Sequence, residues 1–193
     1  HDLAWTLEEQ LPGHAPRRLS RSVVHDVVAA LGAMPVGTRP ASVRPTASAL
    51  ARVLPGRAGR LDDVATAVDA ALAGVPAVRA HGDLWLRNLL VHGGRLSGIV
   101  DWDGSRPDGV PGVDLLHLVA TDLRARRREG LGRVWSRRPW DARRFVDGLA
   151  GAWPADAPAP RAVVREAIGV AWWLEAVAGT VGRVPARARD PRW

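Results

Sequence analysis

A two-residue turn near the middle of the chain constrains the fold more than any other feature. Residues 89–92 and 95–100 are β-prone runs, and Gly93-Gly94 separates them. Two glycines are a favoured hairpin loop because both loop positions need a positive φ. The sequence therefore predicts an antiparallel hairpin over residues 89–100.

Helical periodicity surrounds this hairpin on both sides. Ser20 precedes a stripe of valines and is the expected cap of the first helix. Apolar residues at helical spacing predict further helices over residues 61–72, 113–123, 141–149 and 161–181. Residues 35–55 contain several prolines and are expected to be irregular, with a short helix around 46–53. Residues 3–11 are expected to form a short strand. The predicted fold class is therefore α+β, mainly α, with one central hairpin.

The predicted hairpin brings two oxygen-bearing side chains together. With the two glycines as the loop, Asn88 faces Ile99, and its diagonal neighbour is Asp101. Side chains alternate along a strand, so Asn88 and Asp101 are expected on one face with backbones roughly 7–8 Å apart. Mg²⁺ takes oxygen ligands and completes its shell with water and substrate phosphates. The spacing therefore allows Asn88 and Asp101 to share one hard cation, and Mg²⁺ is a candidate.

A third acidic residue lies on the loop that enters the hairpin. Asp83 precedes Asn88 by five residues and is placed to accept a proton from a hydroxyl. Phosphoryl transfer depends mainly on positioning and on neutralising phosphate charge. A base carboxylate, a carboxamide and a metal-binding carboxylate supply those functions. The three residues therefore predict a kinase-type site, against the plainer interpretation that they satisfy backbone donors in a turn.

The stretch from His81 to Asp103, HGDLWLRNLLV followed by GIVDWD, resembles the catalytic and metal loops of the aminoglycoside phosphotransferase and choline kinase-like superfamily. These are small-molecule kinases with a protein-kinase-like fold, and the HGDLW opening is similar to the fructosamine kinase branch. The resemblance implies that Asp83 is the catalytic base and that Asn88 and Asp101 bind Mg²⁺. It also implies that His81 braces the loop and that Asp114 hydrogen-bonds to it.

The resemblance extends to both ends of the chain. Residues 7–13 are similar to the family's hinge, where the backbone of Glu9 and Leu11 would meet the adenine of ATP. It implies a division into residues 1–13, the last N-lobe strand and hinge, and residues 14–193, a kinase-like C-terminal lobe. The family's glycine-rich loop and phosphate-binding lysine have no counterpart here. We therefore expect the family's N-terminal nucleotide lobe to be missing from these residues, and whether it is encoded upstream stays an open question.

Four further residues are candidates for substrate contact. Trp85 and Arg87 lie inside the catalytic loop, and Arg87 is either a contact to an anionic group or an exposed arginine. Asp103 is either a substrate contact or a solvent-exposed loop residue. Glu175 lies on the last helix, which helps to wall the substrate pocket in related kinases. The implied substrate is a small molecule with a hydroxyl group, such as a sugar or amino sugar.

Two other aromatic or basic features are interpreted as structural. His117 stands among leucines, so we assign it to the core or its boundary. At least one of Trp172 and Trp173 is expected in the core.

Composition excludes several classes of protein. The 193 residues contain no cysteine, which excludes a disulfide framework, a thiolate zinc site and a cysteine nucleophile. All 27 basic residues are arginine, so Schiff-base lysine chemistry and a Walker A loop are excluded. No apolar run reaches the roughly 18 residues that span a bilayer. We expect a cytoplasmic protein without a membrane partner.

Two alternative functions remain open. The lobe is either a catalytic phosphotransferase or an inactive kinase-like binding or scaffold module. The net charge of +7 raises a third, less favoured alternative, a nucleic-acid-binding domain. Its basic residues are Arg124, Arg126, Arg127, Arg128, Arg137, Arg138, Arg143 and Arg144. We favour a solvated face because no recognised nucleic-acid motif accompanies them.

Overall fold

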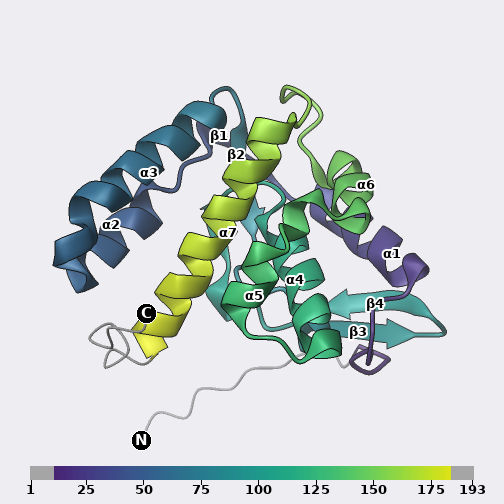
Figure 1. Cartoon of the computed structure of the whole chain (residues 1–193). Helices are drawn as coiled ribbons and strands as arrows, with labels where there is room; N and C mark the ends of the chain where they lie inside the picture. Colours follow the sequence, from purple (N-terminus) through teal and green to yellow (C-terminus); the bar gives the residue numbers. More distant parts are fainter. Residues whose placement is uncertain (1–10, 184–193) are drawn as a thin grey trace, which may run out of the picture.

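Two small antiparallel sheets lie among the helices of this chain (Figure 1). The structure, a computed structural model, describes residues 11–183. The helices are α1 (Arg21–Gly32), α2 (Arg44–Val53), α3 (Ala58–Ala71), α4 (Val113–Arg127), α5 (Leu131–Ser136), α6 (Arg143–Ala152) and α7 (Ala162–Arg183). The strands are β1 (Val36–Pro40), β2 (Pro76–Ala80), β3 (Leu89–His92), β4 (Arg95–Ile99) and β5 (Arg106–Gly109). The fold is α+β and mainly helical, as predicted.

Helix α1 shows why the helical predictions succeeded. The Ser20 hydroxyl accepts a hydrogen bond from the Val23 amide at 3.2 Å, which satisfies one of the unpaired donors of the first turn. Val23 and Val27 are buried on one face. Asp26 on the same helix accepts hydrogen bonds from the Arg95 guanidinium and the Leu96 amide of β4. These contacts hold the pKa of the Asp26 carboxyl well below its usual range and tie α1 to the hairpin.

A three-stranded sheet in the order β1-β2-β5 was not predicted. Strand β1 pairs Val36 with Val78 of β2, and β2 in turn pairs Ala80 with Arg106 of β5. The prediction that residues 35–55 are irregular was therefore wrong for residues 36–40, and α2 begins at Arg44, earlier than expected. Proline is compatible with both elements, because Pro40 ends an edge strand and Pro45 lies in the first turn of α2.

The hairpin is formed by β3 and β4, but its register differs from the predicted one. Strand pairing begins as expected with His92 opposite Arg95 and then shifts, so that Leu89 faces Ile99. The residue passed over is Ser97, whose hydroxyl donates to the Pro12 carbonyl. The prediction that Asn88 faces Ile99 was therefore wrong. A single extra residue in one strand moves every later pair by one position.

Two clusters of buried side chains hold the elements together. The larger one joins α2 and α3 to α4, α6 and α7. The smaller one joins α1, the hairpin and the loop before it: Leu19, Val23, Val27, Leu84, Leu89, Val91 and Leu118. Leu118 comes from α4, which Figure 1 shows between α7 and the hairpin. Leu84 and Leu89 are fully buried, so they anchor both ends of residues 85–88.

Candidate active site

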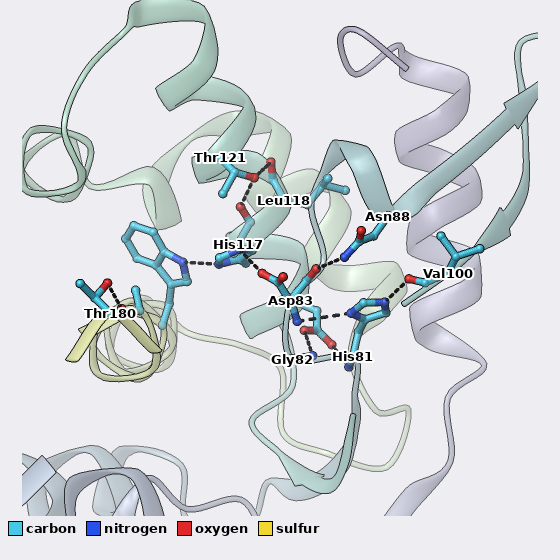
Figure 2. A network of polar contacts seen from close by, with 12 residues as sticks. His81, Gly82, Asp83, Asn88, Val100, His117, Leu118, Thr121 and Thr180 are labelled. Atoms are coloured by element: carbon cyan, nitrogen blue, oxygen red, sulfur yellow. Dashed lines mark hydrogen bonds and ion pairs between the residues drawn. The ribbon is translucent and has the colours of Figure 1, made fainter. Parts of the chain in front are cut away.

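The first turn of α4 anchors the loop that follows β2. The Asp114 carboxylate accepts hydrogen bonds from the main-chain amides of His81 at 2.6 Å and Gly82 at 3.0 Å (Figure 2). Bonds from amides to an ionised carboxylate are stronger than neutral ones. Asp114 therefore fixes the backbone at the entrance of residues 81–88.

His81 connects this loop to the segment after β4. Its side chain is 1% exposed, and its Nδ1 accepts from the Asp83 amide at 3.3 Å. A neutral imidazole with an acceptor Nδ1 carries its proton on Nε2. Nε2 therefore donates to the Val100 carbonyl, 2.9 Å away. The imidazole also packs against the Trp102 ring, with centroids 4.6 Å apart.

Gly82 allows the two loops to approach closely. Its φ is +86°, a conformation that side chains disfavour. A Cβ atom at this position would lie 2.4 Å from the carbonyl oxygen of Gly104. Glycine is required here by both the backbone angle and the space.

Asn88 is buried and is hydrogen-bonded to Asp83. Its side-chain Nδ2 donates to the Asp83 main-chain carbonyl at 2.9 Å, and the main-chain carbonyl of Asn88 accepts from the Val100 amide. Since a carbonyl oxygen only accepts, the amide nitrogen must face Asp83, and Oδ1 points the other way. The side chain of Asn88 therefore presents an oxygen ligand of fixed orientation.

Asp83 itself reaches solvent. Its side chain is 50% exposed, and its Oδ1 lies 3.5 Å from Nε2 of His117 on α4. The main chain of Asp83 is bonded on both sides, through its amide to His81 and through its carbonyl to Asn88. A carboxylate that is held by its backbone and accessible at its tip can meet a substrate hydroxyl.

Asp101 follows β4 in the left-handed conformation, with φ 65° and ψ 60°. Residues other than glycine rarely adopt this conformation, and such outliers cluster at functional sites. The Trp102 indole next to it donates to the Ile99 carbonyl at 2.8 Å, which closes the turn. The Asp101 carboxylate is exposed.

The residues present fit a hard divalent cation. Asn88 offers one oriented amide oxygen and Asp101 one exposed carboxylate, and Mg²⁺ is commonly bound by one or two protein oxygens together with phosphates and water. Within residues 11–183 no cluster of three or more His, Cys, Asp or Glu residues could hold a metal ion. An ion held by Asn88 and Asp101 would need its remaining ligands from a phosphate or from water.

The predicted substrate contacts lie in different surroundings. The Arg87 guanidinium is 5.7 Å from the centroid of the Trp85 ring, a cation–π contact, and Arg87 is exposed. Asp103 is exposed as well. The Glu175 carboxylate forms an ion pair with Arg106 of β5. Burial raises the pKa of Glu175 above its usual range, against the opposing effect of Arg106.

The predicted hinge is only partly described. Glu9 lies outside the described residues. The Leu11 side chain lies against β4, where a Cβ atom on Gly98 would be 2.4 Å from it. Residue 14 forms a bridge to Val91 of β3. The division at residue 13 and the adenine contacts stay predictions.

The sequence interpretation missed two polar residues next to this site. His117 was assigned to the core or its boundary, yet its imidazole contacts Asp83 and accepts from the Trp172 indole at 3.2 Å. Arg106 was not considered. A Cβ atom on Gly82 would lie 3.6 Å from its guanidinium. The contacts of both residues join distant parts of the chain. The sequence offers little to indicate them: His117 is a polar residue in an apolar helix, and Arg106 stands at the end of a loop.

The burial of polar residues supports one site. In the described part of the chain, four polar or charged residues are buried: His81, Asn88, Asp114 and Asp122. Polar side chains are costly to bury unless they are hydrogen-bonded. The first three carry the bonds described above and belong to the predicted set.

Comparison with known families defines the class of protein. The model of the phosphotransferase enzyme family matches residues 1–149. This match covers more than half of the chain, so the chain belongs to that family and is a kinase-like phosphotransferase. The predicted kinase-like superfamily is thereby confirmed. No curated protein matches the sequence.

Two further observations concern possible partners. Among the helices within residues 11–183, none is both long enough and apolar enough to cross a membrane. Several arginines of the basic run pair with carboxylates: Arg126 and Arg144 with Asp122, Arg137 with Glu129, Arg138 with Asp141 and Glu166, and Arg143 with Asp147. The interpretation of these arginines as a solvated face stays a prediction.

Proposed function

We propose that this protein transfers the γ-phosphoryl group of ATP to a hydroxyl group of a small molecule, such as a sugar or amino sugar. One observation carries the proposal. The Asn88 side-chain nitrogen is bonded to the Asp83 main-chain carbonyl, which fixes the orientation of the Asn88 side-chain oxygen within the same loop that carries the accessible Asp83 carboxylate. In a kinase-like phosphotransferase, that pair supplies a base and a metal ligand.

Asp83 would orient the substrate hydroxyl and accept its proton as the oxygen attacks phosphorus. General-base assistance typically contributes about 10²–10⁴-fold to the rate. Asn88 and Asp101 would hold Mg²⁺, which neutralises phosphate charge when it is bound. His81 and Asp114 would keep the loop in place through the main-chain bonds at its entrance.

The remaining predicted contacts complete the proposal. The backbone of Glu9 and Leu11 would meet adenine. Trp85 and Arg87 would border the substrate or its phosphate, and Asp103 would lie at the rim. Glu175 would act together with Arg106, because the two side chains are already paired.

The first test is a calorimetric titration of the chain with ATP, with and without Mg²⁺. We expect binding that requires Mg²⁺ and is lost in Asp101→Asn. The matched control is Asp63→Asn, which removes the same charge from an exposed position on α3. Binding of equal strength without Mg²⁺, or unchanged in Asp101→Asn, would contradict the metal assignment. A chain that does not bind ATP is retested as the longest encoded polypeptide.

The second test is phosphoryl transfer from γ-labelled ATP to a panel of hydroxyl compounds. Asp83→Ala is expected to lower turnover by roughly 10²–10⁴-fold, with ATP binding retained. Full activity in Asp83→Ala would refute the assignment of the base. ATP binding without transfer to any acceptor in the longest polypeptide would favour the inactive binding module instead.

A further inference from the structure

His117 lies between two groups that come from distant parts of the chain. Its Nε2 is 3.5 Å from Oδ1 of Asp83, and its Nδ1 is 3.2 Å from the indole nitrogen of Trp172. Figure 2 shows the imidazole pointing from α4 toward Asp83. The three residues belong to the catalytic loop, α4 and α7.

The indole determines which nitrogen of His117 carries the proton. Trp172 Nε1–H is a donor only, so Nδ1 of His117 must be the acceptor. In the neutral imidazole the proton then lies on Nε2, which faces the Asp83 carboxylate. The contact between His117 and Asp83 is thereby a donor facing an acceptor.

His117 and Trp172 are both held rigidly by their surroundings. Trp172 is almost fully buried in the larger core. His117 lies on α4 between the buried Leu116 and Leu118, and the Thr121 hydroxyl donates to its carbonyl at 2.7 Å. The imidazole is therefore fixed relative to the loop that it contacts.

We propose that His117 is a positioning residue for Asp83 and that Trp172 selects the tautomer that allows it to act. The inference rests on the proposed role of Asp83 as the base. The His117 N–H beside Oδ1 restricts rotation of the Asp83 carboxylate. The other carboxylate oxygen is then held in one orientation toward the substrate hydroxyl. The family match ends at residue 149, so the Trp172 contribution comes from beyond the matched region.

The tautomer can be measured without activity. Long-range ¹H–¹⁵N spectra of histidine-labelled protein at about pH 8, where imidazoles are ordinarily neutral, show which nitrogen is protonated. We expect His117 to carry its proton on Nε2, with its resonances assigned by comparison with His117→Gln. Trp172→Phe should shift the Nδ1 resonance, and Trp173→Phe is the matched control. A proton on Nδ1 in the wild type, or an Nδ1 resonance unmoved in Trp172→Phe, would overturn the inference.

A kinetic arm tests the consequence for turnover. His117→Leu is expected to lower kcat roughly tenfold, because the polar contact at Oδ1 of the charged Asp83 carboxylate is lost, with KM for ATP unchanged. His117→Gln retains an amide donor and should recover most of the loss. An active wild type with unchanged kcat in His117→Leu refutes the positioning role. An inactive wild type counts against the proposed function instead, and the imidazole spectra still decide the hydrogen-bond arrangement.

Discussion

Asp114→Asn is expected to destabilise the chain and to loosen the catalytic loop. In the native protein the two carboxylate oxygens of Asp114 accept from the amides of His81 and Gly82. Asparagine has almost the same shape but replaces one oxygen with an NH₂ group. In either orientation of the amide, one backbone donor then faces another donor.

The size of the effect follows from these two bonds. A buried donor left without an acceptor costs about 1–3 kcal/mol. The remaining bond becomes neutral and retains roughly half its strength. Together these losses amount to about 2–4 kcal/mol of the free energy of unfolding. With a urea slope of about 2 kcal/mol per molar, the midpoint should fall by roughly 1–2 M.

The assay is urea unfolding of the wild type and Asp114→Asn, with Asp63→Asn as a charge-matched control at an exposed site. Phosphoryl transfer is measured on the same samples in low urea. We expect turnover to fall even where the variant is fully folded, because the backbone before Asp83 loses its anchor. A midpoint within error of that of the control would refute the assignment of Asp114 as the support of the loop.

Three other perturbations follow from the structure. Gly82→Ala should cost about 2 kcal/mol or more in thermal unfolding, because of its positive φ and the close carbonyl, whereas Gly56→Ala, which meets nothing within 4 Å, should not. Asp26→Asn should be less stable than the wild type at pH 7. Folding lowers the pKa of the Asp26 carboxyl, so its contribution to stability is present above the unfolded pKa and is lost as the pH falls. The difference in urea midpoint between the wild type and Asp26→Asn should therefore narrow below about pH 4. A difference that stays constant with pH would contradict this. Glu175→Leu combined with Arg106→Met should be less destabilised than the sum of the single variants, by about 1–3 kcal/mol in a double-mutant cycle, and strict additivity would contradict the ion pair.

Features that depend on neighbouring residues were predictable. The cap at Ser20, the valine stripe behind it and the Gly93-Gly94 turn are local, so the amino-acid types alone indicate a helix and a hairpin. The loop residues Asp83, Asn88 and Asp101 could be proposed as candidates for the same reason. They lie within one short stretch, and their proposed roles stay predictions.

The register of the hairpin was not predictable from its turn. The residues on both sides of the glycines pair as expected, but Ser97 bulges out, and its hydroxyl meets the Pro12 carbonyl. The positions of Asn88 and Asp101 are therefore not set by the alternation of side chains along a strand. Asn88 ends a short 3₁₀ turn, and Asp101 takes a left-handed conformation beyond the strand.

The sequence by itself determined the helices, the turn and the identity of the loop residues, because each of these depends on side chains a few positions apart. Only the tertiary structure decided which distant side chains meet next to the loop of residues 81–88. The Trp172 indole meets His117 across 55 residues, and Arg106 meets Glu175 across 69. Such contacts arise when the helices pack around a shared core, and no local pattern of residues specifies the partner.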